Sequence, residues 1–124
     1  MPVIRNTNIK KYDIPTAQFA TYAAPSLGAK ETAVWRIALK AKSEGLIHQL
    51  TREEIILAID GSAVADIDGE RHVVSAGETL IIPAYVDFSL SNPNAAEFAA
   101  IAIFPVGGQA VVGKDVPFTP PWAA

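Results

Sequence analysis

The sequence predicts an all-β fold of the sandwich or barrel type, on three observations. From Thr32 onward, short β-branched or apolar segments alternate with turn residues at the spacing of about 8 to 12 residues that is typical of such folds. No segment holds a convincing helical period. The separating segments SEG, DGS, DGE, AGE and SNPN combine glycine, which tolerates positive φ, with Asp, Asn and Ser, which cap turns.

The expected strands follow one another along the chain. They are residues 32–39, 46–50, 54–59, 63–67, 71–75, 79–83, 86–91 and 97–104. The DGE segment after ADI predicts a hairpin, because an Asp-Gly pair suits the positive φ angles of a two-residue turn.

Alternation within two strands indicates which faces are buried. In VDFSLS, the face of Phe88 is expected to be buried and the face of Ser89 exposed. In EIILAI both faces are apolar, so we expect this strand to be covered on both sides. Glu54 then lies at the mouth of a cavity, pairs with a cation or stays protonated, because an ionised, unpaired and buried carboxylate costs several kcal/mol.

The length of 124 residues predicts a single domain. We expect residues 1–31 to pack on the barrel, residues 32–105 to form its core, and residues 106–124 to run as a Pro-rich tail over a surface. In that tail Phe118 and Trp122 either lace the barrel or dock on a second subunit, and the sequence leaves both options open.

Composition excludes several partners and sites. A net charge of −3 without any Lys/Arg run argues against nucleic acid and anionic membrane surfaces. No apolar run approaches a membrane span, and the absence of cysteine excludes disulfides and thiolate ligands, so we expect a cytoplasmic protein. The doubly apolar strands 54–59 and 97–104 predict a homodimer, because so small a domain does not cover them alone.

Two spaced motifs carry a resemblance to a known family. The first has the form HxH, three residues, E, six residues, G, and its positions are filled by His48, Leu50, Glu54 and Gly61. The second begins with a glycine and ends with an asparagine, and its positions are filled by Gly77, Pro83, Tyr85, Phe88 and Asn92. On these residues the sequence resembles a small single-domain cupin. The resemblance implies a double-stranded β-helix, a jelly-roll barrel of two antiparallel sheets.

The resemblance also implies where a metal would sit. The usual cupin centre has three His and one Glu, whereas this sequence places Leu50 and Phe88 where two of the imidazoles would be. Leucine and phenylalanine donate nothing to a metal, so we expect no cofactor; a divalent transition metal held by His48 and Glu54 is the alternative. His72 follows a hairpin turn and is interpreted as a solvated surface residue rather than a ligand.

The predicted site is an apolar pocket around the polar pair His48 and Glu54, which are the candidate catalytic residues. A contact between them would hold the carboxylate ionised and suit proton transfer, whereas the alternative is two buried polar groups that satisfy each other. Arg36 either faces solvent or enters the pocket to hold a substrate carboxylate. The candidate substrate-binding residues are Arg36, Leu50, Ile56, Tyr85, Phe88, Leu90 and Asn92.

Three functions are compatible with this pocket. The first is binding of a small organic acid or carbonyl compound and its transformation by proton transfer, in an isomerase, dehydratase or cyclase type of reaction. The second is a non-catalytic cupin that binds a small molecule, and the third is a metal-dependent, oxygenase-type cupin. Fold alone does not decide between them, so whether the chain is an enzyme stays open.

Overall fold

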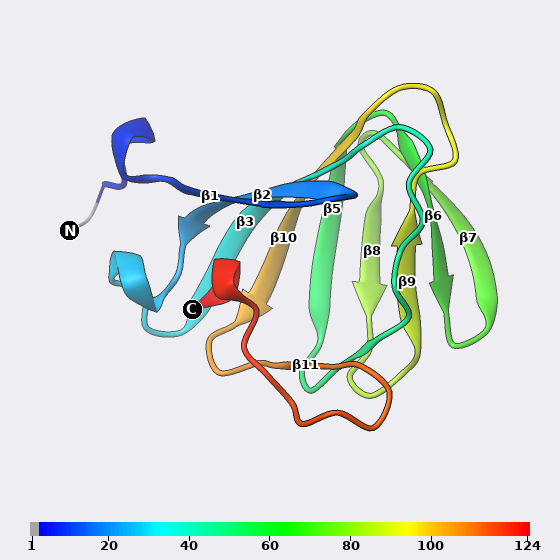
Figure 1. The fold of residues 1–124 in the computed structure, drawn as a ribbon. Helices are drawn as coiled ribbons and strands as arrows, with labels where there is room; N and C mark the ends of the chain where they lie inside the picture. The colour runs from blue at the N-terminus through cyan, green and yellow to red at the C-terminus, as the bar shows by residue number, and fades with distance from the viewer. Residues whose placement is uncertain (1–2) are drawn as a thin grey trace.

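A computed structural model describes residues 3–124, and it is an all-β barrel built from antiparallel sheets (Figure 1). The larger sheet has six strands in the order β1-β2-β3-β10-β5-β8, and a three-stranded sheet has the order β7-β6-β9. A short pair, β11-β4, closes one end. The bounds are β1 (Lys10–Ile14), β2 (Ala17–Ala23), β3 (Thr32–Leu39), β4 (Gln49–Leu50), β5 (Glu54–Asp60), β6 (Ser62–Ile67), β7 (Glu70–Ser75), β8 (Thr79–Ile82), β9 (Phe88–Ser91), β10 (Phe98–Pro105) and β11 (Ala110–Val111).

The predicted all-β fold is confirmed, and most strand positions agree with the sequence pattern. β3 spans the predicted residues, whereas β4 is only two residues long because the chain before it runs without regular pairing. The β6–β7 hairpin turns at Asp68 and Gly69, whose φ angles of 51° and 80° are those that a two-residue turn of this kind requires.

The N-terminal segment does more than pack on the barrel, because β1 and β2 form a hairpin that extends the larger sheet from β3. The sequence pattern missed these strands. In β2 the buried residues Ala17, Phe19 and Thr21 alternate with half-buried ones, as in any strand with one face on a core. Alanine and threonine give this alternation little contrast in hydrophobicity, so it does not stand out in the sequence.

The strand β5 differs from its expected environment. Glu54, Ile56 and Ala58 face the interior and are buried, but on the other face Leu57 is 37% exposed and Ile59 44% exposed. The expectation that β5 is covered on both sides is therefore wrong for the single chain, since only its inner face meets the second sheet. On β9 the face of Phe88 is buried as expected, but Ser89 is buried as well.

Over residues 3–124 the helical content is limited to three short 3-10 turns, η1 (Asn6–Asn8), η2 (Pro25–Leu27) and η3 (Pro121–Ala123). Within the described residues, no helix has the length and apolar character needed to cross a membrane.

The Pro-rich tail packs on its own barrel. Residue Ala110 pairs with Leu50 of β4 and also bridges to Phe118, so the tail folds back across the closed end of the cavity. The turn η3 then brings Trp122 against the first strands, where its ring stacks on Phe19. Within the single chain Trp122 packs on the barrel, and Phe118 lines the cavity while it stays 44% exposed.

Candidate ligand cavity

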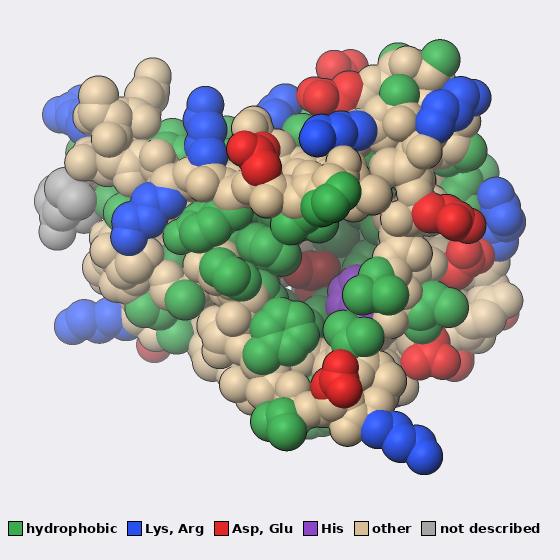
Figure 2. Space-filling view, in the orientation of Figure 1, with side chains coloured by type: hydrophobic (Ala, Val, Ile, Leu, Met, Phe, Trp, Pro, Cys, Tyr) green, Lys and Arg blue, Asp and Glu red, His purple; other side chains and the backbone are tan. Residues whose placement is uncertain are grey.

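The barrel encloses a cavity of about 430 Å³, which lies in the lower part of the range of roughly 300–1,000 Å³ for small-molecule sites. Its walls come from β2, β3, β5, β9 and β10 and from the C-terminal tail. Figure 2 shows its mouth as a hollow bordered by hydrophobic side chains, with a histidine at the edge and an acidic side chain deeper inside. Such a lining, mainly apolar with a few polar groups, is typical of ligand pockets.

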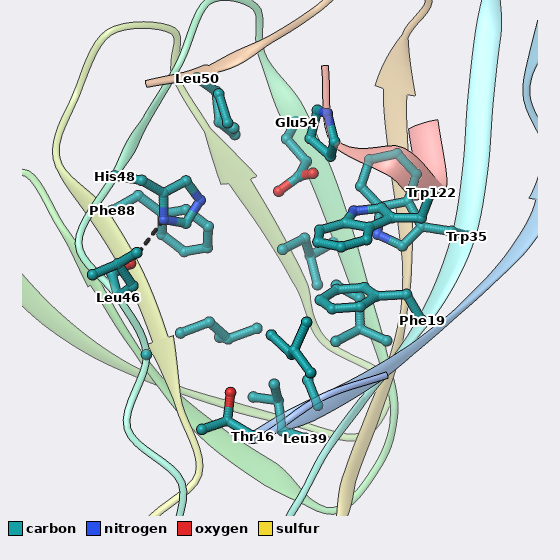
Figure 3. Close-up of a pocket in the computed structure, with 18 of the residues that line it drawn as sticks. Thr16, Phe19, Trp35, Leu39, Leu46, His48, Leu50, Glu54, Phe88 and Trp122 are labelled. Atoms are coloured by element: carbon teal, nitrogen blue, oxygen red, sulfur yellow. Dashed lines mark hydrogen bonds between the residues drawn. The ribbon is translucent and has the colours of Figure 1, made fainter. Parts of the chain in front are cut away.

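His48 is held against β9 by its backbone and by its ring. Its N–H donates to the carbonyl of Phe88 at 2.9 Å and its carbonyl accepts from the Phe88 N–H at 2.8 Å. The ring Nδ1 lies 2.8 Å from the carbonyl oxygen of Leu46, which only accepts, so Nδ1 carries the proton. In the neutral ring, Nε2 is then an acceptor, and it faces the cavity (Figure 3).

Gly45 lets the segment before His48 lie this close to β9. A Cβ built at this position would collide with the backbone carbonyl of Leu90, so only glycine fits without a backbone shift. The N–H of Gly45 also donates to the Ser91 hydroxyl at 2.8 Å. Gly45 therefore allows the close approach to β9 that positions His48.

Glu54 begins β5 opposite Ile82 of β8, and this pairing aims its side chain into the cavity. The residue is only 6% exposed, and among residues 3–124 its carboxyl group has neither a hydrogen-bond partner nor an ion-pair partner. Burial raises the pKa of Glu54 from 4.5 to about 8, because the ionised form loses its hydration. At neutral pH the carboxyl group is therefore mainly protonated and acts as a hydrogen-bond donor.

His48 and Glu54 share the cavity but do not contact each other. No ion pair or hydrogen bond joins them within the described chain, and Figure 3 shows them on separate walls with open space between. The charge-assisted contact that would hold the carboxylate ionised is therefore not formed in the described chain, and Leu50 lies beside the two side chains. Of the three options for Glu54, cavity placement and protonation hold, and pairing with a cation does not.

Aromatic side chains form much of the remaining wall. The rings of Phe19 and Trp122 stack with centroids 3.7 Å apart and planes 2° apart, and Trp35 meets Phe104 edge to face at 6.1 Å. The Thr21 hydroxyl donates to the carbonyl of Trp122 at 2.8 Å and fixes the end of the tail. Phe19 and Trp122 are cavity residues that the sequence pattern does not predict. For Trp122, the sequence feature that points to a packing role is the run of prolines and aromatic residues at the C-terminus.

The structure brings six of the predicted site residues together in the cavity wall. They are His48, Leu50, Glu54, Ile56, Phe88 and Leu90. Phe88 and Leu90 lie on the face of β9 that the alternation pattern indicates is buried, whereas His48, Leu50 and Glu54 stand at positions of the first motif. Ile56 shares the inward face of β5 with Glu54.

The other three predicted residues lie outside the cavity wall. Arg36 follows the inward Trp35 on β3 and therefore occupies the opposite face of the sheet. Tyr85 is 64% exposed, with a positive φ of 60°. Asn92 is buried, and its amide donates to the backbone carbonyls of Leu39, Lys40 and Ala96, which is a structural role.

The donors present do not fit the usual three-His, one-Glu metal centre. Residues 3–124 hold no group of three His, Cys, Asp or Glu side chains placed to bind one ion. Near His48 the positions of two further imidazoles are filled by Leu50 and Phe88, which have no donor atoms. His72 lies on the surface, 3.5 Å from Glu70, in agreement with its interpretation as a solvated residue.

Comparison with known proteins shows which family the chain matches. The cupin domain family model matches residues 34–104, and no curated protein matches the sequence. Among solved structures, the polyketide cyclase RemF from Streptomyces resistomycificus aligns with a TM-score of 0.79 at 15% identity, over 97% of this chain and 89% of that one. An RmlC-like cupin from Shewanella frigidimarina aligns with a TM-score of 0.72 at 18% identity, over 85% and 90%. Salicylate 1,2-dioxygenase from Pseudoaminobacter salicylatoxidans, solved with gentisate, aligns with 0.70 at 14%, over 82% of this chain but 30% of that one. At sequence identities this low, the likeness to these structures shows a shared fold and nothing further.

Proposed function

The chain belongs to the cupin family, and from this premise we propose that it binds a small organic acid or carbonyl compound and transforms it by proton transfer. The observation that carries the proposal is the cavity itself, in which a hydrogen-bond acceptor and a hydrogen-bond donor face the same space without neutralising each other. A site whose acid and base are kept apart has both available to a ligand.

The proposed roles follow from the protonation states. Nε2 of neutral His48 is the base that removes a proton from the carbon next to a carbonyl group. The carboxyl O–H of Glu54 donates to the carbonyl oxygen and gives its proton as charge develops there. The products are an enol, a Glu54 carboxylate and a protonated His48. In a ligand whose enol is conjugated with a C=C bond or carries a neighbouring hydroxyl group, His48 gives its proton to another carbon, and the enol O–H returns its proton to Glu54 as the carbonyl re-forms, which yields an isomer. The dehydratase and cyclase reactions begin with the same proton abstraction.

Two features of the cavity favour this chemistry over simple storage of an apolar molecule. The hydrogen bond from Nδ1 to the Leu46 carbonyl fixes the tautomer and orientation of His48, as a catalytic base requires. The buried setting keeps Glu54 protonated at neutral pH, where an exposed glutamate would be ionised. The cyclase among the structural neighbours is consistent with this class of reaction and adds no evidence beyond the fold.

The test is exchange of α-protons for deuterium in a panel of ketones and keto acids, followed by NMR in D₂O. We expect exchange with the wild-type protein, a loss of at least about a hundredfold in His48→Gln and a comparable loss in Glu54→Leu, since each removes one partner of the transfer. Exchange should be unchanged after dialysis against a chelator, because the donor set does not fit a metal centre. Full exchange in both variants would disprove the proposal. Tight binding without exchange would favour the non-catalytic binding module.

We also propose that the protein is a homodimer, with a small molecule as the ligand of each subunit. The support is the apolar outer face of the larger sheet, which the single chain leaves exposed.

A further inference from the structure

We propose that the cavity selects uncharged, ring-containing carbonyl compounds over carboxylates of the same shape. This inference rests on the proposed function and narrows its substrate class from organic acid or carbonyl compound to the uncharged carbonyl compound.

The charged residues that line the cavity favour an uncharged ligand over a carboxylate. Within the described chain, no Lys or Arg lines the cavity, and Arg36, the cation expected to hold a carboxylate, lies on the other face of its sheet. The acidic residues Glu44 and Glu54 do line it. A carboxylate ligand would therefore lose its hydration and meet no opposite charge, which is costly in an apolar site.

The two polar groups Glu54 and His48 also favour a carbonyl compound over a carboxylate. Glu54 offers a donor and His48 offers an acceptor, each from a different wall. A carbonyl oxygen accepts from Glu54, and an acidic C–H or O–H group of the same ligand faces His48. A carboxylate ligand offers acceptors only, so His48 would stay without a partner. The carboxylate would also compete with Glu54 for the proton that the carboxyl group donates.

The aromatic side chains of the cavity wall favour ligands that contain a ring. Six Phe and Trp side chains line the cavity, namely Phe19, Trp35, Phe88, Phe104, Phe118 and Trp122. Aromatic walls favour ligand rings through offset stacking and edge-to-face contacts, which an aliphatic chain does not make. The volume of about 430 Å³ limits the ligand to a small ring system.

The test compares two ligands of similar shape, 2-acetylnaphthalene and 2-naphthoate, by isothermal titration calorimetry at about pH 7.5, below the raised pKa of Glu54 of about 8. We expect the ketone to bind at least about tenfold more tightly than the carboxylate. Equal binding, tighter binding of naphthoate, or binding of neither compound would overturn the inference.

A matched pair of variants locates the selection in the cavity. Leu46 lines the mouth and is 66% exposed, whereas its neighbour Ile47 is 61% exposed and does not line the cavity. We expect Leu46→Arg to strengthen naphthoate binding several-fold with little change for the ketone, and Ile47→Arg to leave both unchanged. An equal gain in the two variants would mean that net charge, not the cavity, decides selection, and would overturn the inference.

The two proposals fail in different ways. Ketone binding with the expected selectivity but without α-proton exchange would disprove the proton-transfer function and leave the ligand class standing. Exchange accompanied by equal affinity for the two naphthalene compounds would disprove the ligand class and leave the function standing.

Discussion

At the scale of single residues, Glu54 links the cavity to the stability of the fold. Burial raises the pKa of Glu54 from 4.5 to about 8, so between these values the folded protein holds a proton that the unfolded chain releases. The free energy of unfolding therefore falls as the pH rises through this window, by an amount on the order of a few kcal/mol. Below about pH 4.5 both states are protonated, and above about pH 8 both are ionised, so the slope from this group ends there.

We expect Glu54→Gln to remove this dependence. The amide has nearly the same shape and stays neutral, so the variant should match the wild type near pH 5 and exceed its stability near pH 9. Urea denaturation at both pH values measures the difference. Glu53→Gln is the matched control, because Glu53 is exposed and its replacement should leave the slope intact. A wild-type slope that persists in Glu54→Gln would assign the effect to other groups.

Tyr85 gives a second prediction at this scale. It stands where the family motif has glycine, and its φ of 60° is a left-handed conformation that costs a non-glycine residue roughly 1–2 kcal/mol. The side chain is 64% exposed, so little packing offsets this cost. We expect Tyr85→Gly to raise the free energy of unfolding by up to about 1 kcal/mol, after the entropy that glycine adds to the unfolded chain.

The control for this substitution is Ala84→Gly. Ala84 has no positive φ and is half-buried, so glycine there adds entropy to the unfolded chain and removes a methyl contact, and should destabilise the protein by about 0.5–1 kcal/mol. Chemical denaturation of both variants at one pH provides the comparison. A loss of stability in both variants would show that the contacts of Tyr85 outweigh its backbone strain.

At the scale of elements, the C-terminal tail is part of the cavity wall. Trp122 stacks on Phe19 and meets Tyr12 edge to face at 6.4 Å, while its carbonyl accepts from Thr21. We expect Trp122→Ala to cost roughly 2–3 kcal/mol of stability, less than a fully buried tryptophan because Trp122 is only half-buried. The cavity should also open, so ligand dissociation should accelerate in stopped-flow measurements.

Phe118 provides the comparison for the tail. It also lines the cavity but is 44% exposed and stacks on no other ring, so Phe118→Ala should cost less than Trp122→Ala. Equal losses in the two variants would mean that the whole tail, rather than the Trp122 stack, closes this side of the barrel.

Strands with strong contrast between their faces could be predicted from the sequence, and strands without it could not. The β6–β7 hairpin and β3 follow from turn residues and β-branched runs, which are local signals. The hairpin of β1 and β2 was missed because β1 is largely charged and exposed, and because in β2 the inward Thr21 is no more apolar than the outward Ala20 and Tyr22. Its place in the sheet depends on pairing with β3, which is a tertiary fact.

Of the cavity, only the residues on the inward faces of some strands could be predicted from the sequence. Motif spacing and alternation placed His48 and Glu54 there, but neither signal gives the distance between side chains on different strands. The direction of Arg36 was ambiguous because its neighbours on both faces are apolar. The closure by Trp122 depends on a tail that folds back over more than a hundred residues of chain, beyond the reach of any local pattern.

At the scale of the whole molecule, the outer face of the larger sheet carries a continuous apolar surface. Register places Ile103, Ile55 and Ile81 side by side on β10, β5 and β8, and Ile101 beside Leu57 in the next row. Of these, Ile81 is 61% exposed and Leu57 and Ile103 are each 37% exposed. Contiguous apolar surface of this kind is rare on monomers and marks an interaction site.

We propose a second copy of the chain as the partner of this surface, because in a two-fold dimer the same apolar patch on each subunit covers the other. We therefore expect a solution mass near twice 13.2 kDa by sedimentation velocity. Ile81→Lys should shift the protein to the monomer, since two added charges would be buried across the axis without partners. The same change on the other sheet, Val73→Lys at a residue 67% exposed, is the control and should leave the mass unchanged. A wild-type protein that sediments as a monomer at micromolar concentration would exclude the dimer, and loss of the dimer in both variants would move the interface away from this face.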